Sequence, residues 1–277
     1  MFFTTARQRG LLRTLGAATR RLAAVVAAGE IADPAATDVL KNLASAAAPS
    51  ENAAAVAADR FAQAVAGAAV TTRRLSQGDA RLNRAALRFA HGNPVAAAVI
   101  QAMDPDGWAS PAARDMASQV RIAADACAAA MEAAPGAARW SLDGPEVHFF
   151  EHFLAAIDAP TRRRLGVYYT PAAVARRLAS AALAAAPTSS EATILDPAMG
   201  TGVFLLAVIE VLESQARAHR ASGAPSSTPR LAGWELLPGP LVVAHLLLGR
   251  RLAAAEDLSP DDLQLSIQLT DALARCA

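Results

Sequence analysis

The sequence has few of the residues that build disulfide frameworks, cysteine zinc sites or aromatic cores. Only two of its 277 residues are cysteines, Cys127 and Cys276, and 5% are aromatic. Two cysteines so far apart exclude a disulfide scaffold or a cysteine-based zinc site, so we expect a protein of the reducing cytoplasm. Lys41 is the sole lysine, and arginine therefore carries almost all of the positive charge.

Neither a large net charge nor a long apolar run marks the chain. The formal net charge is +1, so any basic surface that binds nucleic acid has to be local. In the basic N-terminal segment the longest uncharged run, 22–29, is too short to span a membrane. We interpret this arginine-rich segment as a surface helix, and its layout leaves a targeting role open.

Residues 1–140 predict an all-α domain. Apolar residues recur at helical spacing in 53–70 and 81–90, and the alternation that marks strands is absent. Glycine, proline, asparagine and aspartate gather where we expect loops, at 46–52, 76–79, 91–94 and 103–108.

The pattern changes in residues 141–277. This part begins with a helix for which Asp143 is the expected N-cap, with Pro145 and Glu146 in its first turn and Pro160 at its end. Short apolar strands are then expected at 192–196, 230–235 and 263–269, separated by helices at 203–218 and 240–255. Strands that alternate with helices pair in parallel, so the sequence predicts an α/β sheet after the helical domain.

The stretch "ILDPAMGTGVFL" joins the first strand to the following helix. Asp196 lies at the carboxyl end of the strand, where α/β sheets bind ligands, and Gly200 and Gly202 let the backbone approach one closely. Leu205 stands where a dinucleotide fingerprint needs a third glycine, and the loop lacks the lysine of a phosphate loop. The acid favours a ligand with an ammonium or sulfonium group. The alternative is a strand–turn–helix that binds nothing.

The other two strands also end in acids. Glu235 closes the second strand, where a carboxylate accepts hydrogen bonds from ribose hydroxyls, and Asp271 follows the third. A ligand with a ribose and positive charge describes S-adenosylmethionine, which we predict as the cofactor. For Asp271 taken alone, a role as a helix or turn cap stays open.

The loop "DPAMGTGVFL" resembles the cofactor loop of the adenine-N6 DNA methyltransferases, D-P-A-C-G-S-G-x-F-L, with Met199 and Thr201 replacing a cysteine and a serine. "GVYYTPAAVARRL" is similar to the motif that precedes it in that family. "VHFFEHFLAAIDAPTRRRLGVYYTP" and "GWELLPGPLVVAHLLLGRRL" resemble the methyltransferase part of Type ISP restriction–modification enzymes, and residues 59–75 resemble their helical spacer. Residues 1–58 match nothing in these enzymes.

The resemblance implies a helical spacer over 1–140. Residues 141–277 would be the N-terminal half of a Rossmann-like methyltransferase domain, holding its first three strands. Tyr168, Thr170 and Pro171 would border the methionine end of the cofactor, Glu235 would take the ribose and Asp271 the adenine. For Tyr168 and Tyr169, ordinary packing is the alternative. The full set of implied cofactor-binding residues is Tyr168, Thr170, Pro171, Asp196, Pro197, Ala198, Gly200, Thr201, Gly202, Phe204, Glu235 and Asp271.

The implied activity is methylation of adenine N6 in double-stranded DNA by the complete enzyme of a restriction–modification system. The family acts through Asn/Asp-Pro-Pro-Tyr/Phe, which the printed sequence lacks. The nearest match, "GNPV" at 92–95, is read as a turn. We therefore expect an inactive fragment without catalytic residues, and a second chain with the remaining parts stays open as a partner. A methyltransferase for another substrate and a non-catalytic binding or scaffold protein are the alternatives.

Two further patterns allow a functional interpretation. "HFFEH" places His148 and His152 on one helix face, but a third metal ligand is missing, so we predict packing and no metal. The segment "TRRR" at 161–164 and the pair Arg176–Arg177 form a basic cluster that could contact DNA phosphates or lie on a solvated helix face.

Overall fold

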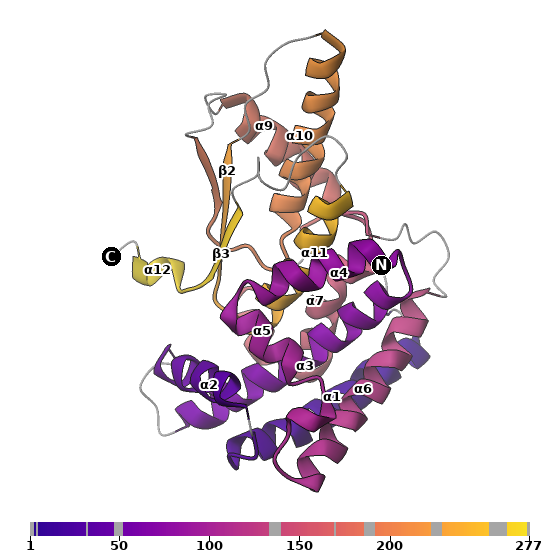
Figure 1. Ribbon diagram of the computed structural model, residues 1–277, viewed down its shortest axis with the longest axis vertical. Coiled ribbons are helices and arrows are strands. Elements are labelled where there is room, and N and C mark those ends of the chain that lie inside the picture. The colour runs from indigo at the N-terminus through magenta and orange to yellow at the C-terminus, as the bar shows by residue number, and fades with distance from the viewer. Residues whose placement is uncertain are drawn as a thin grey trace.

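The computed structural model describes most of the chain: residues 3, 5–31, 33–46, 52–132, 140–168, 170–185, 192–222, 229–254 and 265–275. The described part is mostly helical and contains one small parallel sheet (Figure 1). Cys276, Tyr169 and most of the expected loop at 46–52 lie outside the described residues, as do 223–228, which follow the helix expected at 203–218.

The first half of the chain is helical, as predicted. Its helices are α1 (Ala6–Ala27), α2 (Pro34–Ala46), α3 (Ala53–Ser76), α4 (Ala80–His91), α5 (Pro94–Gln101) and α6 (Pro111–Glu132), with a 3-10 turn η1 (Pro105–Gly107) between the last two. The expected breaks at 76–79 and 91–94 are confirmed. In the second, Asn93 is the N-cap of α5 and accepts hydrogen bonds from Val95 N and Ala96 N, so "GNPV" is a turn.

The second half begins with three helices, α7 (Pro145–Ile157), α8 (Ala159–Arg164) and α9 (Ala172–Ala185). The strands and helices β1 (Thr193–Asp196), α10 (Val203–Ser222), β2 (Arg230–Glu235), α11 (Pro238–Ala254), β3 (Leu265–Leu269) and α12 (Ala272–Arg275) follow. The strands lie in the order β1-β2-β3 and both pairs are parallel, as the alternation of strands and helices predicted. Residues 263–264 of the third expected strand lie outside the described part.

Two details at the start of the second half differ from the prediction. Gly144, and not Asp143, is the N-cap of α7, because Gly144 adopts the extended backbone that precedes Pro145 at the helix start. The Asp143 carboxylate instead pairs with the Arg176 guanidinium at 3.2 Å. Pro160 does not simply end α7: Asp158 accepts a hydrogen bond from Thr161 N and caps α8, in whose first turn Pro160 lies.

Helix α11 joins the sheet to the first-half helices, because it packs along α3 and α4 (Figure 1). Gly249 permits the approach to α4, because a Cβ there would lie 2.7 Å from Phe89 Cβ. Gly239 permits a similar approach to α7, because a Cβ there would lie 2.3 Å from the Phe150 ring. Almost every residue of α11 is buried as a result. The division into domains 1–140 and 141–277 stays a prediction, and α11 shows how closely the two parts pack.

A buried ion pair also links the two parts. The Arg74 guanidinium in α3 donates from Nε and Nη2 to one oxygen of Glu146, in the first turn of α7, at 2.9 and 2.5 Å. Both side chains are at most 1% exposed. Arg74 Nη1 and Glu146 Oε2 have no hydrogen-bond partner. The pair fixes the start of α7 against α3, and α7 forms part of the pocket described below.

Among the helices described, none is both long enough and apolar enough to span a membrane.

Candidate functional site

The loop between β1 and α10 is held open by two glycines. Gly200 has a φ of +58° and Gly202 a φ of +87°, which other residues adopt only with strain. A Cβ on Gly202 would also lie 3.2 Å from Leu248, whereas Gly200 faces open space. The two glycines thus have different roles: Gly202 allows packing against α11, and Gly200 leaves room for a ligand.

One backbone and one side-chain hydrogen bond hold this loop against its neighbours. Met199 N donates to Trp234 O of β2 at 2.9 Å, and the Thr201 hydroxyl donates to Val147 O of α7 at 2.7 Å. The Met199 side chain fills the space above Gly233, where a Cβ would lie 2.4 Å from its sulfur. The loop is therefore fixed to both β2 and α7.

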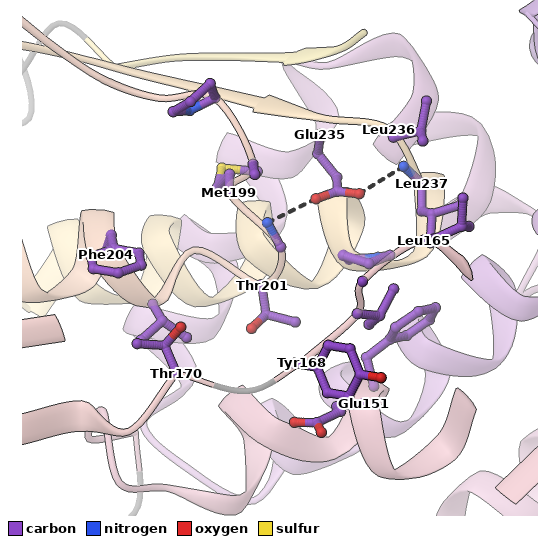
Figure 2. Close-up of a pocket in the computed structure, with 18 of the residues that line it drawn as sticks. Glu151, Leu165, Tyr168, Thr170, Met199, Thr201, Phe204, Glu235, Leu236 and Leu237 are labelled. Atoms are coloured by element: carbon purple, nitrogen blue, oxygen red, sulfur yellow. Dashed lines mark hydrogen bonds between the residues drawn. The ribbon is translucent and has the colours of Figure 1, made fainter. Parts of the chain in front are cut away.

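Glu235 lies at the carboxyl end of β2, beside the loop. Its carboxylate accepts hydrogen bonds from Gly200 N and from Leu237 N, both at 2.7 Å (Figure 2). Burial raises the pKa of Glu235, and the nearby Asp196 charge adds to the rise, while the backbone hydrogen bonds from Leu237, Gly200 and Leu236 oppose it. Each carboxylate oxygen keeps a second lone pair, so the side chain that braces the loop can still accept from a ligand.

Asp196, at the end of β1, keeps one oxygen without a partner. Oδ1 accepts a hydrogen bond from Ala198 N at 3.1 Å, whereas Oδ2 is buried and makes no hydrogen bond. Burial raises the pKa of Asp196, and the hydrogen bond from Ala198 opposes this rise. A buried acceptor without a donor is costly, so Oδ2 marks a position that a ligand N–H or O–H would satisfy.

A cavity of about 330 Å³ opens at this edge of the sheet. Most of the predicted residues line it: Tyr168, Thr170, Pro197, Ala198, Gly200, Thr201, Phe204, Glu235 and Asp271. Pro171, Asp196 and Gly202 are not part of the lining. Asp271 has the capping role that the sequence left open, because its Oδ1 accepts from Leu273 N of α12 at 2.9 Å. Its place in the cavity wall keeps it available to a ligand as well.

One wall of the cavity comes from α7, which the sequence interpretation had assigned to packing. Val147, His148, Phe150 and Glu151 line the cavity. The sequence did contain a signal for this wall, because residues 147, 148 and 151 are spaced so that they share one face of the helix. Burial lowers the pKa of His148 to about 4, so this imidazole is neutral at physiological pH. Among the described residues no group of three histidines, cysteines or acids could hold a metal ion.

A layered arrangement of side chains borders the cavity. The Glu151 carboxylate pairs with the Arg162 guanidinium, which lies 4.5 Å from the centre of the Tyr168 ring. Tyr168 is 58% exposed, so it is not packed in a core. Figure 2 shows Tyr168 and Glu151 together on the side of the cavity opposite Glu235.

The basic cluster near the site is partly neutralised. Arg162 pairs with Glu151, and Arg176 pairs with Glu210 at 2.9 Å as well as with Asp143. Arg163, Arg164 and Arg177 are exposed. The choice between DNA contacts and a solvated face stays open for these three.

Among the described residues, the lining carries carboxylates at Glu151, which pairs with Arg162, at Glu235 and at Asp271, and no lysine or arginine. A cavity of this kind disfavours phosphate and suits a ligand with positive charge and hydroxyl donors.

Comparison with known proteins shows two similarities. Residues 147–236 match the family model of N-6 DNA methylases. A chain of the cryo-EM structure of the DrdV–DNA complex has a similar fold, with a TM-score of 0.59 and 18% sequence identity over 96% of this chain. The present chain spans 25% of that chain's length. A search of curated proteins gave no match.

Proposed function

From the match of residues 147–236 to the N-6 DNA methylase family, we propose a function for the chain. It is the S-adenosylmethionine-binding part of an adenine-specific DNA methyltransferase of a restriction–modification system. Its sheet would be the first three strands of a Rossmann-like domain, and residues 1–140 would be a helical spacer. Double-stranded DNA is the proposed substrate of the complete enzyme. The DNA complex formed by the structural neighbour is consistent with this.

The observation that carries the proposal is the acid-lined cavity at the carboxyl ends of the strands, where Glu235 braces Gly200, a glycine that faces open space. S-adenosylmethionine bears an ammonium, a sulfonium and two ribose hydroxyls. The acidic lining fits these groups. When bound, the cofactor would supply an electrophilic methyl group.

The chain's own residues would bind and orient this cofactor. The Gly200 backbone would allow close approach, and residues 196–202 would form the loop under the cofactor. Glu235 would accept from the ribose while it braces Gly200, and Asp271 would face the adenine. Tyr168 and Thr170 would border the methionine end.

Methyl transfer to adenine also needs groups that accept the hydrogens of the exocyclic amine and stack on the flipped base. The printed sequence contains no Asn/Asp-Pro-Pro-Tyr/Phe, and the Asn93 side chain of "GNPV" caps α5. We therefore expect cofactor binding without turnover. Losing such positioning and electrostatic contributions costs several orders of magnitude in rate.

Two measurements test the proposal. Calorimetry should detect S-adenosylmethionine binding by the wild-type chain and none by Gly200→Trp, whose side chain would fill the open space. Transfer of labelled methyl to adenine-containing DNA should stay at the level of that control. Turnover above the control would refute the expected inactivity, and transfer to protein or RNA instead would favour a different substrate. Absence of cofactor binding would overturn the proposal.

A further inference from the structure

Helix α4 carries a continuous row of three arginines and a histidine. Arg81, Arg84, Arg88 and His91 are all exposed. Their spacing of three, four and three residues places them within one narrow arc of the helix, and at 1.5 Å per residue the row is about 15 Å long. The opposite face of α4, with Ala86 and Ala90, is buried.

The surroundings of this row lack the acids that would neutralise it. The printed sequence has no aspartate or glutamate from Ala80 through Met103, although the whole chain has 25 acids against 26 lysines and arginines. Helices α5 and α11, which make most of the contacts with α4, contain no acid either, and α3, which touches α4 less, contains only Asp59. Among the described residues, the arginines at 81, 84 and 88 make no ion pair. Asp79, the N-cap of α4, is the one acid at the end of the row, and it accepts from Arg81 N and Leu82 N.

Helix α1 makes an instructive comparison, because it also has exposed arginines and no acid. Arg7, Arg13 and Arg20 are exposed on it. However, α1 packs against α3, α6 and α7, all of which carry acids. The Arg20 charge, for instance, acts on Asp59 of α3. On α4 such an interaction occurs at one end of the row, where the Arg81 charge acts on Asp79. The α4 arginines therefore have fewer acids around them than the α1 arginines have.

The side chains around the row indicate what kind of anion it would bind. A helix that lies in a membrane surface exposes apolar side chains beside its basic ones. None of the exposed large apolar side chains of the described structure belongs to α4, and Leu87 and Phe89 pack against the core. A row of guanidinium groups without apolar neighbours suits a regular array of phosphates, such as one strand of a DNA duplex, with 3.4 Å between phosphates along the axis.

We propose that the exposed face of α4, formed by Arg81, Arg84, Arg88 and His91, binds the phosphodiester backbone of duplex DNA independently of base sequence. The choice of DNA as the partner rests in part on the proposed function. The surface is separate from the cavity, because none of its residues lines that cavity. Its role is to hold the duplex on the helical part of the chain through α4, which α11 connects to the site.

The test compares two triple variants that lose the same charge. Arg81→Gln/Arg84→Gln/Arg88→Gln alters α4, and Arg7→Gln/Arg13→Gln/Arg20→Gln alters α1. Glutamine keeps the helix propensity, and circular dichroism and thermal melting check that both variants fold. Fluorescence anisotropy with a labelled duplex of arbitrary sequence is measured with the full chain at several salt concentrations.

The α4 variant should bind about tenfold more weakly or worse, and the slope of log K against log salt should be less steep by about 2–3. The α1 variant should stay close to wild type. Equal losses in both variants would show that overall charge and not this surface is responsible, and unchanged binding by the α4 variant would also overturn the proposal. So would binding of phosphatidylserine vesicles in place of DNA with the same dependence on α4.

Calorimetry with S-adenosylmethionine on the same proteins separates this proposal from the proposed function. Both triple variants should bind the cofactor as the wild type does. A chain that binds no cofactor but binds DNA through α4 would refute the cofactor role alone. A chain that binds the cofactor but shows no α4-dependent DNA binding would refute the α4 surface alone.

Discussion

Glu235 and Gly200 are joined by a hydrogen bond of 2.7 Å, from the backbone N–H in the glycine loop to the carboxylate at the end of β2. The residue predicted to bind the ribose is thus also the residue that holds the loop. The ribose-binding role and the loop-holding role of Glu235 can be separated by variants that change its charge and its hydrogen-bonding capacity to different extents.

We expect Glu235→Ala to weaken S-adenosylmethionine binding by about 1.5–3 kcal/mol, roughly ten- to hundredfold, because it removes charged hydrogen bonds and the brace on Gly200. Glu235→Gln is the control for charge: it is uncharged, and its one amide oxygen can accept from Gly200 N or from Leu237 N but not from both. An intermediate affinity for Glu235→Gln in calorimetry would fit both roles. Equal affinity of all three proteins would remove Glu235 from the site.

Replacement of Arg74 by methionine should destabilise the fold by about 3–5 kcal/mol, because the Glu146 carboxylate stays buried without its partner. The double variant Arg74→Met/Glu146→Leu removes both charges and should recover much of this loss. Denaturant unfolding of the two single variants and the double variant measures the difference. If the double variant were as unstable as the sum of the singles, the two side chains would not act as a pair.

The buried His148 should make stability depend on pH. Its pKa is lowered from 6.5 to about 4 by burial, so the unfolded chain takes up a proton on this imidazole before the folded chain does. Its contribution is present above pH 6.5 and is lost as the pH falls towards 4, up to about 3 kcal/mol. Unfolding free energies should therefore fall less between neutral pH and about pH 5 in His148→Phe than in wild type. His152 and His245, whose pKa values burial also lowers, are present in both proteins. Identical pH profiles would contradict the assignment.

We predict that the purified chain contains no stoichiometric zinc. His148 and His152 share a helix, but His148 faces the cavity, and no third ligand joins them among the described residues. Elemental analysis of the protein purified without chelator measures the content. One zinc per chain that disappears in His148→Ala would prove the prediction wrong.

Local patterns determined much of the architecture. The alternation of apolar strands with amphipathic helices predicted three strands, and β2 was placed correctly at both ends, because a short apolar run between loop residues leaves little choice of boundary. Gly200 and Gly202 were recognised because left-handed backbone in such a loop requires glycine. The family was identified from the same stretch and is confirmed by the match over residues 147–236.

Contacts between distant segments were decided only by the tertiary structure. No spacing pattern in the sequence predicts the ion pair Arg74–Glu146 or the hydrogen bond from Thr201 to Val147. The packing of α11 against α3 and α4 is likewise not predicted by any such pattern. The N-cap of α7 was mispredicted: Gly144 takes that position, and the Asp143 carboxylate accepts a hydrogen bond from Arg176, 33 positions away in the chain. Periodicity records which face of an element is buried, but not which other element covers it. For this reason the α7 wall of the cavity, and the arginine row of α4 with few acids around it, can be recognised only once the helices are packed.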